Sequence, residues 1–177
     1  MKEFSRRTFL GTAPVAAAAG LTLANTSMLS AFAADHNAMP AFPAGIQLFT
    51  AQTIQDDIRV LQAKPGNNDL VEGTSTPFSV ILTVETAKTP KEFEWHEGRD
   101  HVLQIIEGST VLEVGGTPVG GHSKGPGEWL APGSEGAVSI ALKKGDMLVI
   151  PRGTPHKRST AESVTLLLIS PMGTVKS

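Results

Sequence analysis

The sequence predicts an all-β domain, built as a sandwich or a closed barrel, behind a short N-terminal lead-in. Its central part consists of short segments rich in β-branched residues and bounded by Gly or Pro, which is typical of such folds. The 18 Gly and 12 Pro indicate turns rather than disorder, because apolar runs separate them. A chain of 177 residues allows one domain of moderate size.

The first 33 residues have the features of an export signal. Three basic residues precede an uncharged stretch, 8–34, and an A-x-A pattern at 31–33 closes it. The stretch SRRTFL, 5–10, resembles the twin-arginine signal, which a receptor reads as an address. The alternative is a retained membrane helix, but the stretch is mostly Ala, Gly and Thr and Pro14 interrupts it. We therefore expect export to the periplasm by the twin-arginine route, with no stable membrane anchor.

The composition of the remaining chain excludes several classes of function. Removing residues 1–33 leaves 12 basic and 16 acidic residues, a formal charge of −4. No Lys and Arg cluster is present, so we expect no nucleic-acid partner. The chain has no cysteine, which excludes disulfides, thiolate nucleophiles and cysteine-ligated metals.

The lead-in is expected over residues 34–65. Its first part is irregular, because Pro40, Pro43 and Gly45 interrupt it. The segment 53–62 fits a short helix with Thr53 as N-cap, and it fits a strand equally well.

The barrel is expected over residues 66–177. Its predicted strands cover 77–85, 102–106, 110–114, 137–142, 147–150 and 163–169. Between the third and the fourth lies a long segment rich in Gly and Pro, 115–136. A loop of this length is usually functional or mobile, so it is either a lid over a site or an extended hairpin or dimer contact.

Two polar stretches at strand ends carry candidate ligands. Residues two apart in a strand face the same side, so Glu94 points with His96. By the same rule His101 shares a face with Leu103 and Ile105. If this face points into the barrel, His101 lies at the end of an apolar inner wall.

The second stretch is GDMLVIPRGTPH, residues 145–156. A strand is expected to end at Pro151, a tight turn to use Gly153, and His156 to start the return strand. His156 and Arg158 then share a face. Arg158 either anchors a substrate carboxylate in a bidentate fork or pairs with an acid at the barrel rim.

The stretch 145–156 resembles the second motif of the cupins in its full spacing. The first cupin motif usually reads His-x-His, three or four residues, Glu, six residues and Gly. Aligned on Gly108, this chain has Glu94 at the first His position, His96 at the second and His101 at the Glu position. The donor types are therefore present but transposed.

The resemblance covers roughly residues 78–169 and implies a single cupin barrel, a double-stranded β-helix or jelly roll. It implies Glu94, His96, His101 and His156 as metal ligands. Three imidazoles and one carboxylate suit Fe, Mn, Ni, Co or Zn as divalent ions. The alternative is a metal-free cupin whose His and Glu form an internal hydrogen-bond network.

The same resemblance implies an enzyme acting on a small organic substrate. Arg158, which shares a face with His156, is the candidate catalytic-site residue if it anchors that substrate. An oxygenase-type reaction of a metal-dependent dioxygenase is expected, and a redox-neutral isomerase or lyase is the first alternative. A non-catalytic module that binds a metal or small ligand is the second. A homodimer is compatible with the family. Glu97 and Asp100, between the ligands, either accept a hydrogen bond from a ligating imidazole or are plain turn residues.

Overall fold

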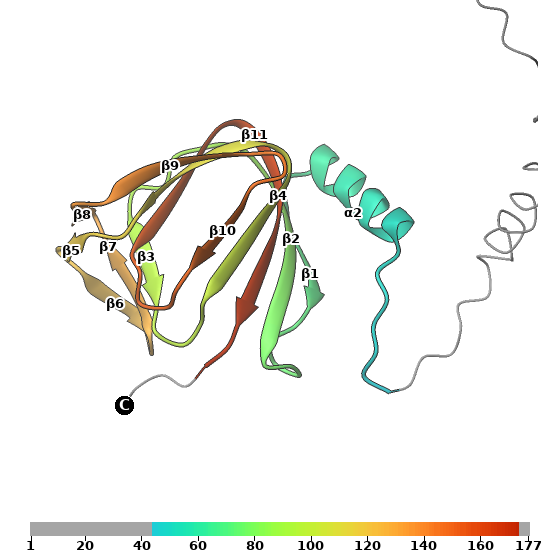
Figure 1. Cartoon of the computed structure of the whole chain (residues 1–177), viewed down its shortest axis with the longest axis horizontal. Helices are drawn as coiled ribbons and strands as arrows, with labels where there is room; N and C mark the ends of the chain where they lie inside the picture. The colour runs from blue at the N-terminus through green and yellow to red at the C-terminus, as the bar shows by residue number, and fades with distance from the viewer. Residues whose placement is uncertain (1–43, 174–177) are drawn as a thin grey trace, which may run out of the picture. The chain divides into compact units, whose positions relative to one another are not determined.

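The structure, a computed structural model, describes residues 44–173 (Figure 1). The predicted export signal and the first part of the predicted lead-in lie outside these residues. Within the described part of the chain, no helix is long and apolar enough to cross a membrane.

Within the described residues, helix α2 (Ala51–Ala63) precedes the strands, so the helical alternative for the segment 53–62 is confirmed. Its N-cap is Thr50 and not the predicted Thr53. Thr50 has an extended backbone, with ψ at 158°, and its hydroxyl accepts a hydrogen bond from the Thr53 N–H at 3.1 Å. The helix buries Ile58 and Leu61 on one face.

Strands make up most of the remaining described chain, and all their pairings are antiparallel. They are β1 (Gly66–Val71), β2 (Phe78–Lys88), β3 (Phe93–His96), β4 (His101–Val114), β5 (Thr117–Val119), β6 (His122–Gly125), β7 (Glu128–Ala131), β8 (Gly133–Glu135), β9 (Val138–Lys143), β10 (Met147–Ile150) and β11 (His156–Pro171). β10 has the predicted bounds. The predicted strands 102–106 and 110–114 are two halves of β4.

Two long strands, β4 and β11, pair with each other along their length and take part in two sheets. The first half of β4 and the second half of β11 lie in the order β1-β2-β11-β4-β10. The other halves lie in the order β9-β4-β11-β3-β7-β6. Figure 1 shows these strands curling around a common interior. The predicted all-β jelly-roll barrel is confirmed by this pairing.

The bend in β4 falls at Gly108, which adopts a φ of +73°. A Cβ placed there would lie 2.1 Å from the carbonyl oxygen of Ser163 on β11. The register of β4 with β11 shifts here, between Ser159 and Val164. Glycine is therefore required, both for the backbone conformation and for the close approach of β11.

The core has two parts. Inside the barrel, apolar side chains of β4, β9, β10 and β11 form one cluster: Leu103, Ile105, Leu112, Leu142, Ile150, Val164 and Leu166. Outside, α2 packs on the outer face of β2 through Ile58, Leu61, Leu82 and Val84. Because β2 is covered on both faces, its residues Leu82–Glu85 are all buried. The inner face of β2 is thereby left for polar residues that line the interior.

The segment 115–136 forms paired strands, as the hairpin alternative requires. β5 pairs with β8, and β6 pairs with β7. β7 also pairs with β3, and this register places Glu128 opposite His96. The segment therefore extends the second sheet and brings one of its acids to the predicted site.

Candidate metal centre

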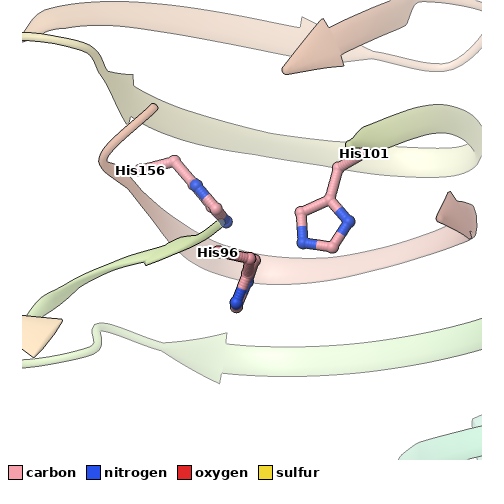
Figure 2. A group of neighbouring side chains, drawn as sticks. All are labelled: His96, His101 and His156. Carbon is pink, nitrogen blue, oxygen red and sulfur yellow. The ribbon is translucent and has the colours of Figure 1, made fainter. Parts of the chain in front are cut away.

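Three histidines from three strands meet inside the barrel. His96 ends β3, His101 begins β4 and His156 begins β11. Figure 2 shows their imidazole rings gathered around a common space, and one ligand atom of each lies within 4.8 Å of the others. Each of these residues is at most 7% exposed.

Backbone contacts between the two polar stretches hold these histidines together. The N–H of Gly153 donates to the carbonyl oxygen of His96 at 2.8 Å. The N–H of Arg152 donates to Oδ1 of Asp100 at 2.8 Å. The turn before His156 is thus fixed to the turn between His96 and His101.

Two of the imidazoles use Nδ1 for a hydrogen bond and keep Nε2 for another partner. His156 Nδ1 lies 2.9 Å from the carbonyl oxygen of Thr154. A carbonyl only accepts, so this nitrogen carries the proton and Nε2 carries the lone pair. His101 Nδ1 lies 2.9 Å from the hydroxyl of Ser170. Such contacts set the orientation of a metal-binding imidazole.

The third imidazole, His96, contacts one acidic and one basic residue, and neither was identified from the sequence as part of the site. Its Nδ1 lies 2.6 Å from Oε2 of Glu128 and 2.8 Å from Nη2 of Arg99. Arg99 also binds Glu128, with Nη1 at 2.5 Å from Oε1 and Nη2 at 2.9 Å from Oε2. Burial opposes ionisation of Glu128, but the bonds from Arg99 and His96 outweigh it and hold the pKa of this carboxyl below its usual value. Glu128 accepts a hydrogen bond from the His96 tautomer that is protonated on Nδ1, and this tautomer has its lone pair on Nε2. Arg99 only donates, so it pairs with the tautomer whose Nδ1 is unprotonated.

The fourth predicted ligand, Glu94, lies at the edge of the histidine group. Its Oε1 is 3.8 Å from Nε2 of His156, and its side chain is 51% exposed. It lines the same cavity as His101 and His156. Its position beside His156 fits a ligand, and its half-exposed carboxylate has to turn inward to act as one.

Arg158 also lines that cavity, and the volume of the cavity is about 350 Å³. Its guanidinium pairs with Glu85, with Nη2 at 3.0 Å from Oε2 and Nε at 3.4 Å from Oε1. Two further side chains donate to the Glu85 carboxylate: the Thr160 hydroxyl at 2.8 Å and the Lys88 ammonium at 3.0 Å. Burial opposes ionisation of Glu85, yet these partners, Arg158 first, hold its pKa below the usual value. Arg158 therefore pairs with an acid, as the second alternative predicted, and both residues of this ion pair line the cavity.

Glu97 and Asp100 act in the turn and not on the imidazoles. Glu97 accepts a bond from Nε1 of Trp129 at 3.0 Å. Asp100 binds the Arg152 side chain at 2.7 Å, and the hydrogen bonds from Arg152 lower the pKa of Asp100 to about 2. Among the described residues, the carboxylate that hydrogen-bonds a candidate histidine ligand is Glu128.

The electrostatics of the barrel keep two of the histidines neutral. Burial lowers the pKa of His101 to about 3, and the neighbouring His156 and His96 add to this effect. Burial also lowers the pKa of His156, against the opposing effect of its bond to Thr154. Neutral imidazoles have the lone pairs that a metal ion requires.

These shifts predict a metal-free protein that is destabilised by mild acid. The unfolded chain takes up a proton at His101 near pH 6.5, whereas the folded chain does so only near pH 3. Between these values the unfolded state binds more protons, so the free energy of unfolding falls as the pH falls. We expect a loss of about 1–2 kcal/mol between pH 6.5 and 5, measured by urea denaturation with a chelator present.

His101→Gln should flatten this pH dependence, and His122→Gln, at an exposed site, should leave it unchanged. A wild-type stability that is constant from pH 6.5 to 5 would contradict the prediction.

Glu128→Gln is expected to weaken divalent-metal binding by about 10- to 100-fold, because an amide holds the Nδ1 proton of His96 less firmly than a carboxylate does. The measurement is a competition titration of Zn²⁺ against a chromophoric chelator. The matched control is Glu135→Gln, at the exposed last residue of β8. Equal Zn²⁺ affinity of the two variants would rule out this role of Glu128.

Comparison with known proteins gives similarity of fold. No protein-family model and no curated protein matches the chain. A Klebsiella pneumoniae protein with a double-stranded β-helix domain has 13% identity over 74% of this chain and 94% of its own, with a TM-score of 0.48. A cupin protein of Bacteroides fragilis has 14% identity, with 77% and 91% covered and a TM-score of 0.46. A cupin superfamily protein of Desulfitobacterium hafniense has 16% identity, with 61% and 77% covered and a TM-score of 0.44. Scores below 0.5 carry no information about the site, which rests on its own residues.

Proposed function

We propose that this chain is a metal-dependent cupin that binds a divalent transition metal through His96, His101 and His156, with Glu94 as the fourth ligand. The observation that carries the proposal is the hydrogen bonding of the three buried imidazoles. Each has Nδ1 at a hydrogen-bond partner, in Glu128, Ser170 or the backbone of Thr154. A plain hydrogen-bond network would instead link the imidazoles to one another.

The spacing of these residues fits a metal ion. Metal–nitrogen bonds of about 2.0–2.1 Å place two ligand atoms at most about 4.2 Å apart. The histidine atoms lie within 4.8 Å of one another, so small side-chain rotations suffice. Glu94, 3.8 Å from His156, is already within this limit. The donor set of three imidazoles and one carboxylate suits Fe, Mn, Ni, Co or Zn.

We propose further that the protein is an enzyme, with an oxygenase-type reaction on a small organic substrate. When bound, a metal ion with this donor set supplies Lewis acidity and, as Fe(II), oxygen chemistry. The chain supplies a cavity of about 350 Å³ beside the histidines, large enough for a small molecule. Its apolar wall residues, among them Leu103 and Ile150, exclude water from the reacting groups. The export signal read from the sequence places this activity in the periplasm.

Two other functions fit the same site. A redox-neutral isomerase or lyase would use the metal only to polarise the substrate, and the buried carboxylate of Glu85 lies in the cavity where a proton could be exchanged. A non-catalytic module would bind a metal or a small ligand without turnover.

The test is the binding of metal and of an added diatomic ligand. Protein exported in its native form is expected to contain close to one equivalent of a divalent transition metal. The protein loaded anaerobically with Fe(II) is expected to bind nitric oxide, seen by electron paramagnetic resonance, because four protein ligands leave exchangeable positions. Stoichiometric metal without nitric oxide binding would contradict the oxygenase and favour the binding module. Absence of stoichiometric metal would contradict the metal site itself.

A further inference from the structure

One part of the cavity wall has two positive side chains, Arg158 and Lys88, around one carboxylate, Glu85. Among residues 44–173, Glu85, which is 8% exposed, is the only carboxylate that hydrogen-bonds both Arg158 and Lys88. One negative charge therefore faces two positive ones. Glu85 occupies Nε and Nη2 of the guanidinium, and within residues 44–173 no hydrogen-bond partner contacts Nη1.

Arg158 is oriented and accessible at the same time. Its side chain is 21% exposed, and that of Lys88 is 57% exposed. The fork to Glu85 removes most of the rotamer freedom of the guanidinium before any ligand arrives. Binding an anion at the remaining N–H groups then costs little additional side-chain entropy.

The charged wall lies within reach of the histidines. Arg158 and His156 are two residues apart on one face of β11, a separation of about 7 Å along a strand. Both line the cavity, together with His101.

Apolar side chains line the same cavity together with these polar residues: Leu103, Leu112, Ile150 and Leu168. A ligand that matches this wall needs a hydrocarbon middle. At one end it needs an anionic group, and at the other a group that meets the histidines.

We propose that the cavity takes a small organic acid, whose carboxylate binds Arg158 and Lys88 and whose other end reaches His101 and His156. Glu85 acts as a positioning residue that holds the guanidinium toward the ligand. This inference names a substrate class for the proposed function. The part that places one end of the ligand at His101 and His156 rests on that proposed function. The carboxylate anchor does not depend on the metal.

The test compares acids with their uncharged amides. Butanoate, hexanoate, glutarate and benzoate, each with its primary amide, are titrated into metal-free protein and observed by NMR. We expect at least one acid of the panel to bind at least about tenfold more tightly than its amide, because hydrogen bonds to charged groups are the stronger ones. Equal affinities for every pair, or no binding by any acid, would overturn the proposal.

Arg158→Met should remove the preference for acids, and Arg59→Met is the matched control. Arg59 lies on α2, pairs with Asp56 and is 64% exposed. The single variant leaves Glu85 buried without its partner, so the double variant Glu85→Gln/Arg158→Met is tested as well, because it removes both charges together. A folded double variant that still prefers acids would contradict the role of Arg158.

The same titrations on Zn²⁺-loaded protein separate this inference from the proposed function. If the chain binds no metal, the difference between wild type and Arg158→Met in the metal-free protein still decides the anchor. If metal binds but acids and amides do not differ in either form, the metal site stands and the substrate class is wrong.

Discussion

Replacing His96 and His156 together by Ala is expected to remove stoichiometric divalent-metal binding. The two imidazoles come from different strands, β3 and β11, and their loss leaves His101 with the half-exposed Glu94. One imidazole and one carboxylate form too small a donor set for a stable site. The measurements are the metal content of the exported protein by mass spectrometry and a Zn²⁺ titration of the metal-free form. Each single variant should lose more affinity than the 10- to 100-fold estimated for Glu128→Gln.

The control for this experiment is His122→Ala. His122 lies on β6 with a 55% exposed side chain, 3.7 Å from Glu92, and is not one of the three clustered histidines. Its removal should leave metal content and Zn²⁺ affinity unchanged. If the double variant retains wild-type metal content, or if His122→Ala loses it, the assigned site is wrong.

Gly108→Ala is expected to cost more than about 3 kcal/mol of unfolding free energy. The left-handed backbone at φ +73° alone costs a non-glycine residue about 1–2 kcal/mol. In addition, the new Cβ would lie 2.1 Å from the Ser163 carbonyl oxygen, which belongs to the backbone of β11 and cannot rotate away. The two strands must then separate where β4 bends between the sheets. Urea denaturation, followed by circular dichroism, measures the loss.

Gly136→Ala is the matched control. Gly136 has a φ of +79°, close to that of Gly108, but a Cβ there would meet nothing within 4 Å. Its substitution should cost only the backbone term of about 1–2 kcal/mol. The difference between the two variants measures the clash with β11. Equal losses would mean that the close approach of β4 and β11 is not required.

The local pattern of the sequence was sufficient to predict segments of β2, β4, β9, β10 and β11. β10 begins and ends where alternation and its flanking turns predicted, and the strands predicted at 102–106 and 110–114 both lie within β4. Two parts of the structure could not be predicted from this local pattern. β1, with the sequence GNNDLV, has little β-branched character and forms by pairing with β2. The segment 115–136 is rich in Gly and Pro, and its strand β7 is stabilised by pairing with β3.

The sequence alone indicated the candidate histidines, because strand alternation, the tight turns and the resemblance to the cupin motifs are all local features of the chain. His96, His101 and His156 were identified in this way, and the tertiary structure brings them together. The position of Glu94, beside His156 and half exposed, follows from how the end of β3 meets β11, which alternation cannot specify.

Only the tertiary structure decided which groups surround the histidines. Glu128 reaches His96 across 32 residues, Ser170 reaches His101 across 69, and Glu85 reaches Arg158 across 73. Such pairs depend on strand register, and register depends on the packing of side chains far apart in the chain. The physical reason is the range of each interaction. Strand formation and turn chemistry act over a few residues, whereas the orientation of an imidazole and the charge of a cavity are set by neighbours that only folding supplies.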